Sequence, residues 1–522
     1  MHRIGFPKDS LKGDFLIIAG SVVIAAFSLL LDSAIGSDPA HWVLWGRQID
    51  SLSLRTWETW TTWKPLPTIF TSVYGLTGDH ARNLWIMTAR AACFASAGVA
   101  YRLTVDLTNQ AFLKANIKVR FAPQVGGVLA GLWIFTLTAV PEIHGFMFGF
   151  GEGMLVLLCL LAVQQWIDGK LRMALLFGLL ASLSRPEILA AVALLVLLNW
   201  RARPDLRLLS IGGVVVVLFA WFGIDWMGSG DPLHTTHLAA SWKNVPTGFP
   251  GDENPMIMPQ LAVEEMPLLC LFLLPLGVGA SIWAYRLRLR APMFILAGGL
   301  AWVAVITLMT VLGNSGIGRY MVNPDAFLAI LSGFGTSVVV GLFAASLRKR
   351  KGVLRKAAVL PVVLGIGLVI AEVAVNTVPL VRDEIKMGKA QKFKDDTLRE
   401  AIDLAGGPEK VKACGPIGRT TMEGTIAWFV DGNMEDFSTI HSPASYAKSS
   451  GHKPPPPKVG MMLGIIPVGT TFTRYTRAPK DRKAFISRIE NGHLRKNSSV
   501  RYVGSVGQWD VWQYCPGAPK PS

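Results

Sequence analysis

The sequence predicts a polytopic α-helical membrane protein with a polar domain at its C-terminal end. Only 16% of the 522 residues are charged, against about 25% in soluble proteins. Several apolar runs reach or approach the ~20 residues that a helix needs to cross a bilayer. Past residue 377 these runs stop, and short strand-favouring segments between Gly and Pro residues follow. This pattern excludes a disordered chain, a secreted disulfide scaffold and a soluble enzyme.

The expected membrane segments follow one another as apolar runs separated by polar loops. They lie near residues 14–32, 84–104, 122–141, 152–168, 207–226, 264–285, 292–313, 320–344 and 357–377. A further apolar stretch, 172–200, is interrupted by Ser184-Arg185-Pro186-Glu187, and we interpret it as a broken hairpin. The total is about 11 membrane segments in a domain of residues 1–377. The first segment has no small-residue cleavage site, so we expect a retained helix.

The basic residues predict the orientation. With the N-terminus in the cytoplasm, the cytoplasmic loops hold 21 Lys and Arg residues and the opposite loops before residue 378 hold 7. The positive-inside rule then places the C-terminal domain outside. Half of the net charge of +16 lies in residues 1–377, where the basic residues gather in short loops and reflect membrane topology, and half lies in the polar C-terminal part. We expect membrane lipids as partners. Because no basic groove with interleaved aromatic residues is present, we expect no nucleic-acid partner. We expect the plasma membrane of a bacterium.

Residues 378–522 predict a small extracytoplasmic α+β or mostly β domain. A charged helical stretch, Arg382 to Leu404, comes first. Strand-favouring runs follow at Thr425–Val430, Thr471–Tyr475 and Trp509–Tyr514. The role of this domain, substrate docking or structural capping, stays open.

The five cysteines divide by location. Cys93, Cys159 and Cys270 fall inside apolar segments, where we expect packing roles. Cys414 and Cys515 lie near the two ends of the C-terminal domain. An oxidising exterior would let these two form a disulfide, and two free thiols are the alternative.

The first external loop, residues 33–83, carries the most chemistry. Asp38 follows the first membrane segment, and His41 and Trp42 come next. Trp60, Trp63 and Lys64 lie further along, and prolines stiffen the loop. A carboxylate at the water boundary can act as a base, and tryptophan rings offer surfaces for a sugar. Anchoring at the membrane interface is the alternative role for the tryptophans.

In its order of motifs, the chain resembles the opening of membrane glycosyltransferases of the GT-C superfamily. The motifs are the Asp38-led turn, a helical stretch with aromatic residues from Trp42 to Ile49, the Lys64-Pro65-Leu66-Pro67 element, and Arg90 in the second helix. The most similar members are lipid-linked-sugar transferases related to aminoarabinose transferase and protein O-mannosyltransferases. Their pattern has an Asp-Glu pair and a Pro-Pro-Leu element, whereas this chain has Asp38-Pro39 and Pro65-Leu66-Pro67.

Three more features extend the resemblance. Glu152 opens the fourth segment on the external side, as an acid often does in this superfamily. Arg185-Pro186-Glu187 resembles a turn between two short helices, and Arg319-Tyr320 resembles the start of a late helix. Charges in membrane helices normally face partners or water. Local pairing of Arg185 with Glu187 and snorkelling of Arg319 are the alternatives.

The resemblance implies transfer of a sugar from a polyprenyl-phosphate donor to a glycan or glycolipid acceptor on the outer face, with inversion. Asp38 would be the catalytic base, although an Asp before Pro39 is also a common helix cap. Lys64, Arg319 and Arg185 would bind the donor phosphate, where charge develops in the transition state. Sugar and acceptor would contact His41, Trp42, Trp60, Trp63, Glu152 and Tyr320.

The loop 228–263 offers a weak metal candidate in Asp231, His234 and His237. A flexible loop over the active site is the alternative. The superfamily includes both metal-dependent and metal-independent enzymes, so the resemblance implies no particular cofactor.

Three rival functions share parts of this pattern. A transporter or flippase of lipid-linked saccharides would have paired repeats with broken helices, and this chain has one broken hairpin. A polysaccharide polymerase or ligase with lipid-diphosphate donors would carry its large loop between late helices. A non-catalytic scaffold would not need the acidic and aromatic first loop.

Overall fold

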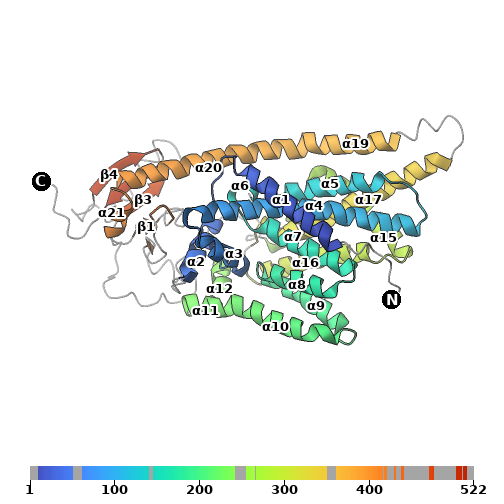
Figure 1. Cartoon of the computed structure of the whole chain (residues 1–522), viewed down its shortest axis with the longest axis horizontal. Helices are drawn as coiled ribbons and strands as arrows, with labels where there is room; N and C mark the ends of the chain where they lie inside the picture. The colour runs from blue at the N-terminus through green and yellow to red at the C-terminus, as the bar shows by residue number, and fades with distance from the viewer. Residues whose placement is uncertain are drawn as a thin grey trace. The chain divides into compact units, whose positions relative to one another are not determined.

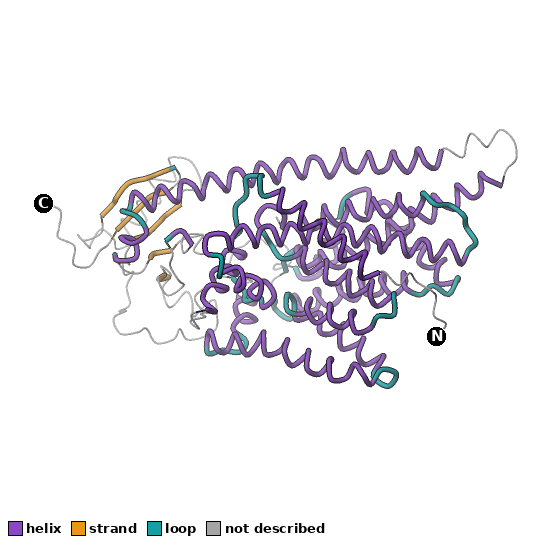
Figure 2. Tube along the Cα trace, in the orientation of Figure 1, coloured by secondary structure: helices purple, strands orange, loops and turns teal. Residues whose placement is uncertain are grey.

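The structure is a computed structural model of the chain. It describes residues 10–50, 61–139, 145–241, 254–264, 266–314, 316–349, 360–414, 417–419, 428–430, 437–439, 470–474, 501–507 and 509–513. Most of this length is helical, and strands occur only toward the C-terminus (Figure 2). The chain divides into two compact units. Unit 1 comprises Met1–Leu31, Asn83–Trp221 and Thr247–Lys386, and unit 2 comprises Asp32–Arg82, Phe222–Pro246 and Met387–Ser522. The domain division expected at residue 377 stays a prediction.

Unit 1 is built from helices (Figure 1). The longer ones are α1 (Ser10–Ser28), α4 (Ala81–Lys114), α5 (Ala122–Ala139), α7 (Glu152–Ile167), α8 (Leu171–Ser182), α9 (Leu189–Asn199), α10 (Arg207–Leu218), α15 (Leu268–Arg286), α16 (Ala291–Val311), α17 (Val322–Lys349) and α19 (Leu360–Glu372). Short elements are α6 (Gly145–Phe148), α14 (Met258–Glu264), the 3-10 turns η2 (Pro186–Ile188), η3 (Pro204–Leu206), η6 (Pro255–Ile257) and η7 (Gly318–Met321), and the π-helical turns η4 (Phe219–Gly223) and η8 (Val373–Thr377). Helix α20 (Val378–Leu404) runs from unit 1 into unit 2.

Eight helical stretches among the described residues are long and apolar enough to cross a membrane. Three shorter apolar helices are Glu152–Ile167, Leu171–Ser182 and Pro186–Asn199. At 1.5 Å per residue, the 16 residues of α7 span about 24 Å, less than the ~30 Å hydrocarbon core. The class of membrane protein is confirmed, and the number of about 11 segments stays a prediction.

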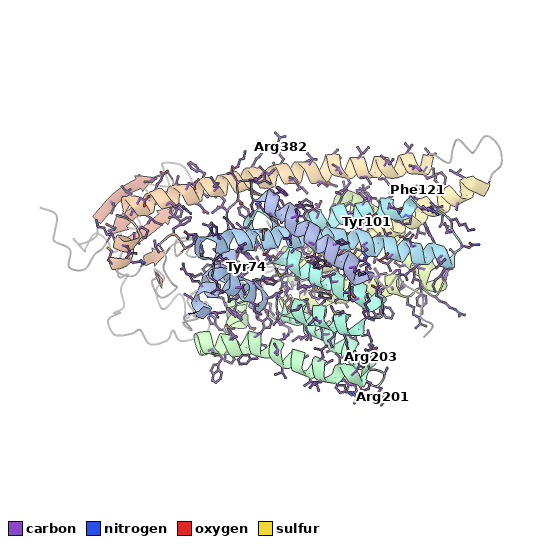
Figure 3. All side chains as sticks on the ribbon, in the orientation of Figure 1. Tyr74, Tyr101, Phe121, Arg201, Arg203 and Arg382 are labelled. Carbon is purple, nitrogen blue, oxygen red and sulfur yellow. The ribbon has the colours of Figure 1, made fainter. Side chains whose placement is uncertain are left out.

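The expected break in the apolar stretch 172–200 is confirmed. Helix α8 ends at Ser182, and Arg185 is extended, with φ −148° and ψ 114°. Pro186 then opens η2, since its fixed φ suits the first position of a helical turn. Figure 3 labels Arg201 and Arg203 at the turn that follows α9, in a loop expected to be cytoplasmic. The orientation stays a prediction.

Glycines let α17 pack closely against α5 and α15. A Cβ atom added to Gly333 would lie 2.5 Å from the carbonyl oxygen of Gly126 on α5. A Cβ atom added to Gly277 on α15 would lie 2.5 Å from the carbonyl oxygen of Leu331. Small residues at such crossings allow backbones to approach, which is how membrane helices gain packing energy.

Unit 2 combines short helices with a sheet. Its helices are α2 (Ser37–Asp50), α3 (Pro65–Gly75), η1 (Gly78–His80), α11 (Ile224–Ser229), α12 (His234–Ser241) and α21 (Pro408–Ala413). The strands β1 (Ile417–Arg419), β2 (Phe437–Thr439), β3 (Thr470–Arg474), β4 (Arg501–Val506) and β5 (Trp509–Gln513) form a mixed sheet of order β2-β1-β3-β5-β4. β1 is parallel to β2 and β3, whereas β5 is antiparallel to β3 and β4.

One local expectation for unit 2 is wrong. Trp428 and Phe429, in the run expected to be a strand, are helical. Residues 425–427 lie outside the described residues. The described part of the loop 228–263 contains α12 in unit 2 and, in unit 1, η6 and the start of α14, and a flexible loop over the active site stays a prediction.

The cysteines follow their expected environments where the structure describes them. Cys93, Cys159 and Cys270 are buried free thiols. Cys414 is disulfide-bonded, as the expected bridge requires. Cys515 lies outside the described residues, so its pairing with Cys414 stays a prediction.

Candidate active site

Asp38 lies in the first turn of α2, which begins one residue earlier at Ser37. Its side chain is neither fully buried nor fully exposed. The Thr61 hydroxyl donates a hydrogen bond to Asp38 Oδ1 at 3.1 Å. A carboxylate that accepts a hydrogen bond from a hydroxyl at a helix N-terminus is oriented and favourably placed in the helix dipole. A carboxylate at such a position can act as a base.

Thr61 also joins Asp38 to His41. The Nδ1 atom of His41 lies 2.8 Å from the carbonyl oxygen of Ser37 and 3.1 Å from Thr61 Oγ1. Because a carbonyl oxygen only accepts, we assign the imidazole proton to Nδ1. His41 is 2% exposed, so it supports the turn that carries Asp38. Sequence reasoning missed Thr61, since a lone threonine in a loop belongs to no recognisable pattern.

Lys64 precedes α3 and lies over the ring of Trp42, with its Nζ atom 5.0 Å from the centroid. This is a cation–π contact. The Thr71 hydroxyl on α3 donates to the carbonyl oxygen of Trp42 at 2.6 Å. These two contacts hold Lys64 and helix α3 against helix α2.

The described tryptophans of this loop, Trp42, Trp45 and Trp63, are buried. Trp42 and Trp63 are 0% and 3% exposed, and the Trp63 ring meets Trp45 edge-on at 5.3 Å. Rings buried in this way build the interior between α2 and α3 and have no open face for a sugar. Trp60 lies outside the described residues. We name Asp38, His41, Thr61, Trp42, Trp45, Trp63 and Lys64 the α2–α3 cluster.

A second group of predicted residues meets in unit 1. The Arg185 guanidinium pairs with Glu187 at 3.2 Å, and its central carbon lies 3.9 Å from the ring centroid of Tyr320. The local pair that was the alternative interpretation is therefore present. The Nη2 atom of Arg185 is buried and has no hydrogen-bond partner among the described residues. A guanidinium with one unused nitrogen can still bind an anionic oxygen.

Arg319 lies next to Tyr320 in η7, and its guanidinium carbon is 5.6 Å from the ring centroid of Phe150. Glu152 opens α7 and is 2% exposed. We name Arg185, Glu187, Arg319, Tyr320 and Phe150 the arginine–tyrosine cluster.

Arg90 has a structural role in α4. It is 0% exposed and donates through Nε to the carbonyl oxygen of Phe146 at 2.8 Å and through Nη1 to the carbonyl oxygen of Ser28. The nearby Trp85 indole donates to the carbonyl oxygen of Gly149 at 2.8 Å. The bonds to Phe146 and Gly149 hold the segment 145–150, which leads to Phe150 and Glu152.

The metal candidate does not assemble among the described residues. His237 Nδ1 lies 2.8 Å from Asp231 Oδ2, and His234 is 8% exposed. Within the described ranges, no group of three or more His, Cys, Asp or Glu side chains could hold a metal ion. Among the described residues, Asp231, His234 and His237 therefore do not form such a group.

The fold and these residues define a class: a polytopic helical membrane protein with Asp38 in its first loop and partly buried arginines, Arg185 and Arg319, in turns between helices. The chain is similar to the crystal structure of ArnT from Cupriavidus metallidurans bound to undecaprenyl phosphate, with 14% sequence identity and a TM-score of 0.52. The similarity covers 99% of this chain and 100% of ArnT. The chain thus has the fold of ArnT, and the expected resemblance is confirmed for the fold. No protein-family model and no curated protein matches the sequence.

Proposed function

We propose that this protein is a membrane glycosyltransferase that moves a sugar from a polyprenyl-phosphate donor to an acceptor. The observation that carries the proposal is the similarity of fold to ArnT, which was solved with undecaprenyl phosphate and is matched along its whole length. We assign Asp38 the role of the base, and Lys64, Arg185 and Arg319 the role of the cations that this chemistry needs. We place the reaction on the outer face of a bacterial plasma membrane, because the basic loops orient the chain that way.

The reaction is a direct displacement at the anomeric carbon. The acceptor hydroxyl oxygen forms a bond to this carbon while the bond to the phosphate oxygen breaks, so the configuration inverts. The acceptor proton passes to Asp38, and the leaving group is the polyprenyl phosphate. Charge develops on the acceptor oxygen and on the phosphate, so a base and cations are the two requirements.

The candidate base and the first of the candidate cations each have a contact or a buried atom that suits the role. Thr61 holds one oxygen of Asp38 at 3.1 Å, which orients the carboxylate for the acceptor hydroxyl. The buried Nη2 atom of Arg185 suits a phosphate oxygen, and Arg319 and Lys64 add positive charge. Glu152 is the second candidate for the base.

The acceptor in this proposal is a glycan or glycolipid. Tyr320 is partly exposed, and Arg185 lies over its ring, so it suits a sugar better than the buried Trp42 and Trp63 do. His41 acts through the turn that holds Asp38.

The test is transfer of radiolabelled sugar from a panel of polyprenyl-phosphate sugars in membranes, with wild type and Asp38→Asn compared. Transfer by wild type alone supports the enzyme class and the base. Equal transfer by both keeps the enzyme and moves the base to Glu152. If no donor is used and a donor crosses sealed vesicles instead, the protein is a transporter.

The phosphate role has its own matched pair of variants. Arg185→Lys keeps the charge but loses the planar fork, so we expect the KM for the donor to rise about tenfold. Arg172→Lys is the control, because Arg172 is 65% exposed and pairs with Asp205. An unchanged KM in Arg185→Lys would remove Arg185 from the donor site.

A further inference from the structure

Helix α2 presents two faces to its surroundings in unit 2. Asp38, His41 and Trp45 recur every three or four residues, so they share one face, and this face contacts Thr61 and Trp63. Leu44 and Arg47 are three residues apart and share a different face. The catalytic candidate and the second face therefore belong to one rigid element.

The second face of α2 packs against the C-terminal part of the chain. Leu44 is 1% exposed. It belongs to a hydrophobic cluster whose other buried members are Leu398, Ala401, Ile402, Ala405, Val411, Val430, Trp509 and Val511. The Arg47 guanidinium lies 5.4 Å from the ring centroid of Trp428. A residue of the first loop thus completes a core that is otherwise made of residues 398–511.

A buried ion pair fixes the end of the same loop. Arg82 Nη2 lies 2.9 Å from Asp395 Oδ2, and the two side chains are only 13% and 8% exposed. Arg82 and Arg399 also lie over the Phe429 ring, at 5.2 and 4.4 Å. At the start of the loop, Asp32 contacts Lys392 at 3.6 Å in an exposed pair. The first loop is therefore fastened at its start, middle and end to residues 392–430.

The C-terminal part is itself tied together around α20. The Trp509 indole donates to the carbonyl oxygen of Lys394 at 3.3 Å, and the Gln513 amide donates to that of Ala405 at 2.7 Å. Strand β5 and helix α20 therefore form one support for α2.

We propose that the C-terminal part of unit 2 holds α2 and thereby positions Asp38, with Leu44, Arg82 and Asp395 as positioning residues. The inference that this part of the chain positions Asp38 for catalysis rests on the proposed function. A displacement of about 1 Å at a reacting group can lower a rate about a hundredfold, so loss of support for α2 should lower kcat more than it raises the donor KM, to which Lys64 beside Trp42 contributes.

The experiment measures amide hydrogen exchange of residues 37–50 in the purified full-length protein, together with kcat and KM for the polyprenyl-phosphate donor. Asp395→Asn leaves the largely buried Arg82 without its charge partner. Leu44→Ala removes most of a buried side chain from the hydrophobic cluster and leaves a cavity there. We expect each to speed exchange in residues 37–50 about tenfold or more, to lower kcat about tenfold, and to change the donor KM by a smaller factor than kcat.

The control and the rescue come from the same chain. Asp383→Asn removes an exposed ion pair with Lys386 on α20, and we expect no change in exchange or kcat. The reversed pair Arg82→Asp with Asp395→Arg should recover part of the lost protection, which excludes general misfolding.

The outcomes separate the two proposals. Unchanged exchange of residues 37–50 in both Asp395→Asn and Leu44→Ala would overturn the inference, whatever the activity. If wild type transfers no sugar, the proposed function fails, and the exchange measurement still decides whether the C-terminal part holds α2. Faster exchange with an unchanged kcat would overturn the positioning of Asp38.

Discussion

The close approach of α2 and α3 predicts that Gly46→Ala destabilises the candidate active site. A Cβ atom added to Gly46 would lie 2.5 Å from Thr71 Oγ1 and 2.6 Å from the Thr71 carbonyl oxygen. One of these atoms belongs to the α3 backbone, so a rotamer change cannot relieve the contact. The two helices must move apart.

The magnitude follows from three contributions. Overpacking of a tight contact costs about 1–3 kcal/mol. The bond from the Thr71 hydroxyl to the Trp42 carbonyl oxygen, 2.6 Å long, weakens when the helices separate, at about 1 kcal/mol. Alanine favours the helix over glycine by about 1 kcal/mol. The free energy of unfolding should therefore fall by about 1–3 kcal/mol.

The assay is urea titration of the purified protein in detergent, followed by tryptophan fluorescence, with sugar transfer measured in parallel. Gly279→Ala in α15 is the control, because a Cβ atom there meets nothing within 4 Å. Adding Thr71→Ala to Gly46→Ala should not restore stability, since the backbone contact remains. A Gly46→Ala protein as stable and active as wild type would refute the reasoning.

Three further predictions address other contacts. Thr61→Val removes the hydroxyl that orients Asp38, and we expect a fall in kcat of about tenfold with a smaller change in KM, measured by sugar transfer; an unchanged kcat would exclude this role. Arg90→Lys keeps a charge in α4, but the shorter ammonium group cannot donate to the Ser28 and Phe146 carbonyl oxygens together. The free energy of unfolding, measured by thermal unfolding followed by fluorimetry, should therefore fall by about 1–3 kcal/mol. Mass spectrometry of non-reduced digests should find the Cys414 peptide linked to the Cys515 peptide, and a free Cys515 would contradict the expected bridge.

Sequence patterns predicted the helices and turns that depend mainly on residues close together in the chain. Apolar runs located most of the apolar helices within a few residues, because a run of that length can bury its backbone in lipid only as a helix. The helices that begin at Ala81 and Leu360 continue well past the ends expected at residues 104 and 377. Arg185-Pro186 located the break between α8 and α9, since proline fixes its own φ and restricts the residue before it. The charged helix ends at Leu404 as expected.

Contacts between distant segments could not be predicted in this way. Trp428 and Phe429 favour strands by composition, yet they are helical where Arg47, Arg82 and Arg399 lie over their rings. Tertiary contacts commonly override such preferences. The joining of Asp38 to His41 through Thr61 spans 20 or more residues, and no spacing in the sequence indicates it.

The fastening of the first loop to α20 has a consequence for the order in which the protein matures. Arg82 and Asp395 are separated by 313 residues, which a ribosome adds in about 15–60 s at 5–20 residues per second. During that interval the nascent chain has made α2 but not the core that receives Leu44. The segment with Asp38 therefore reaches its final packing only late in synthesis, after most membrane helices have been made.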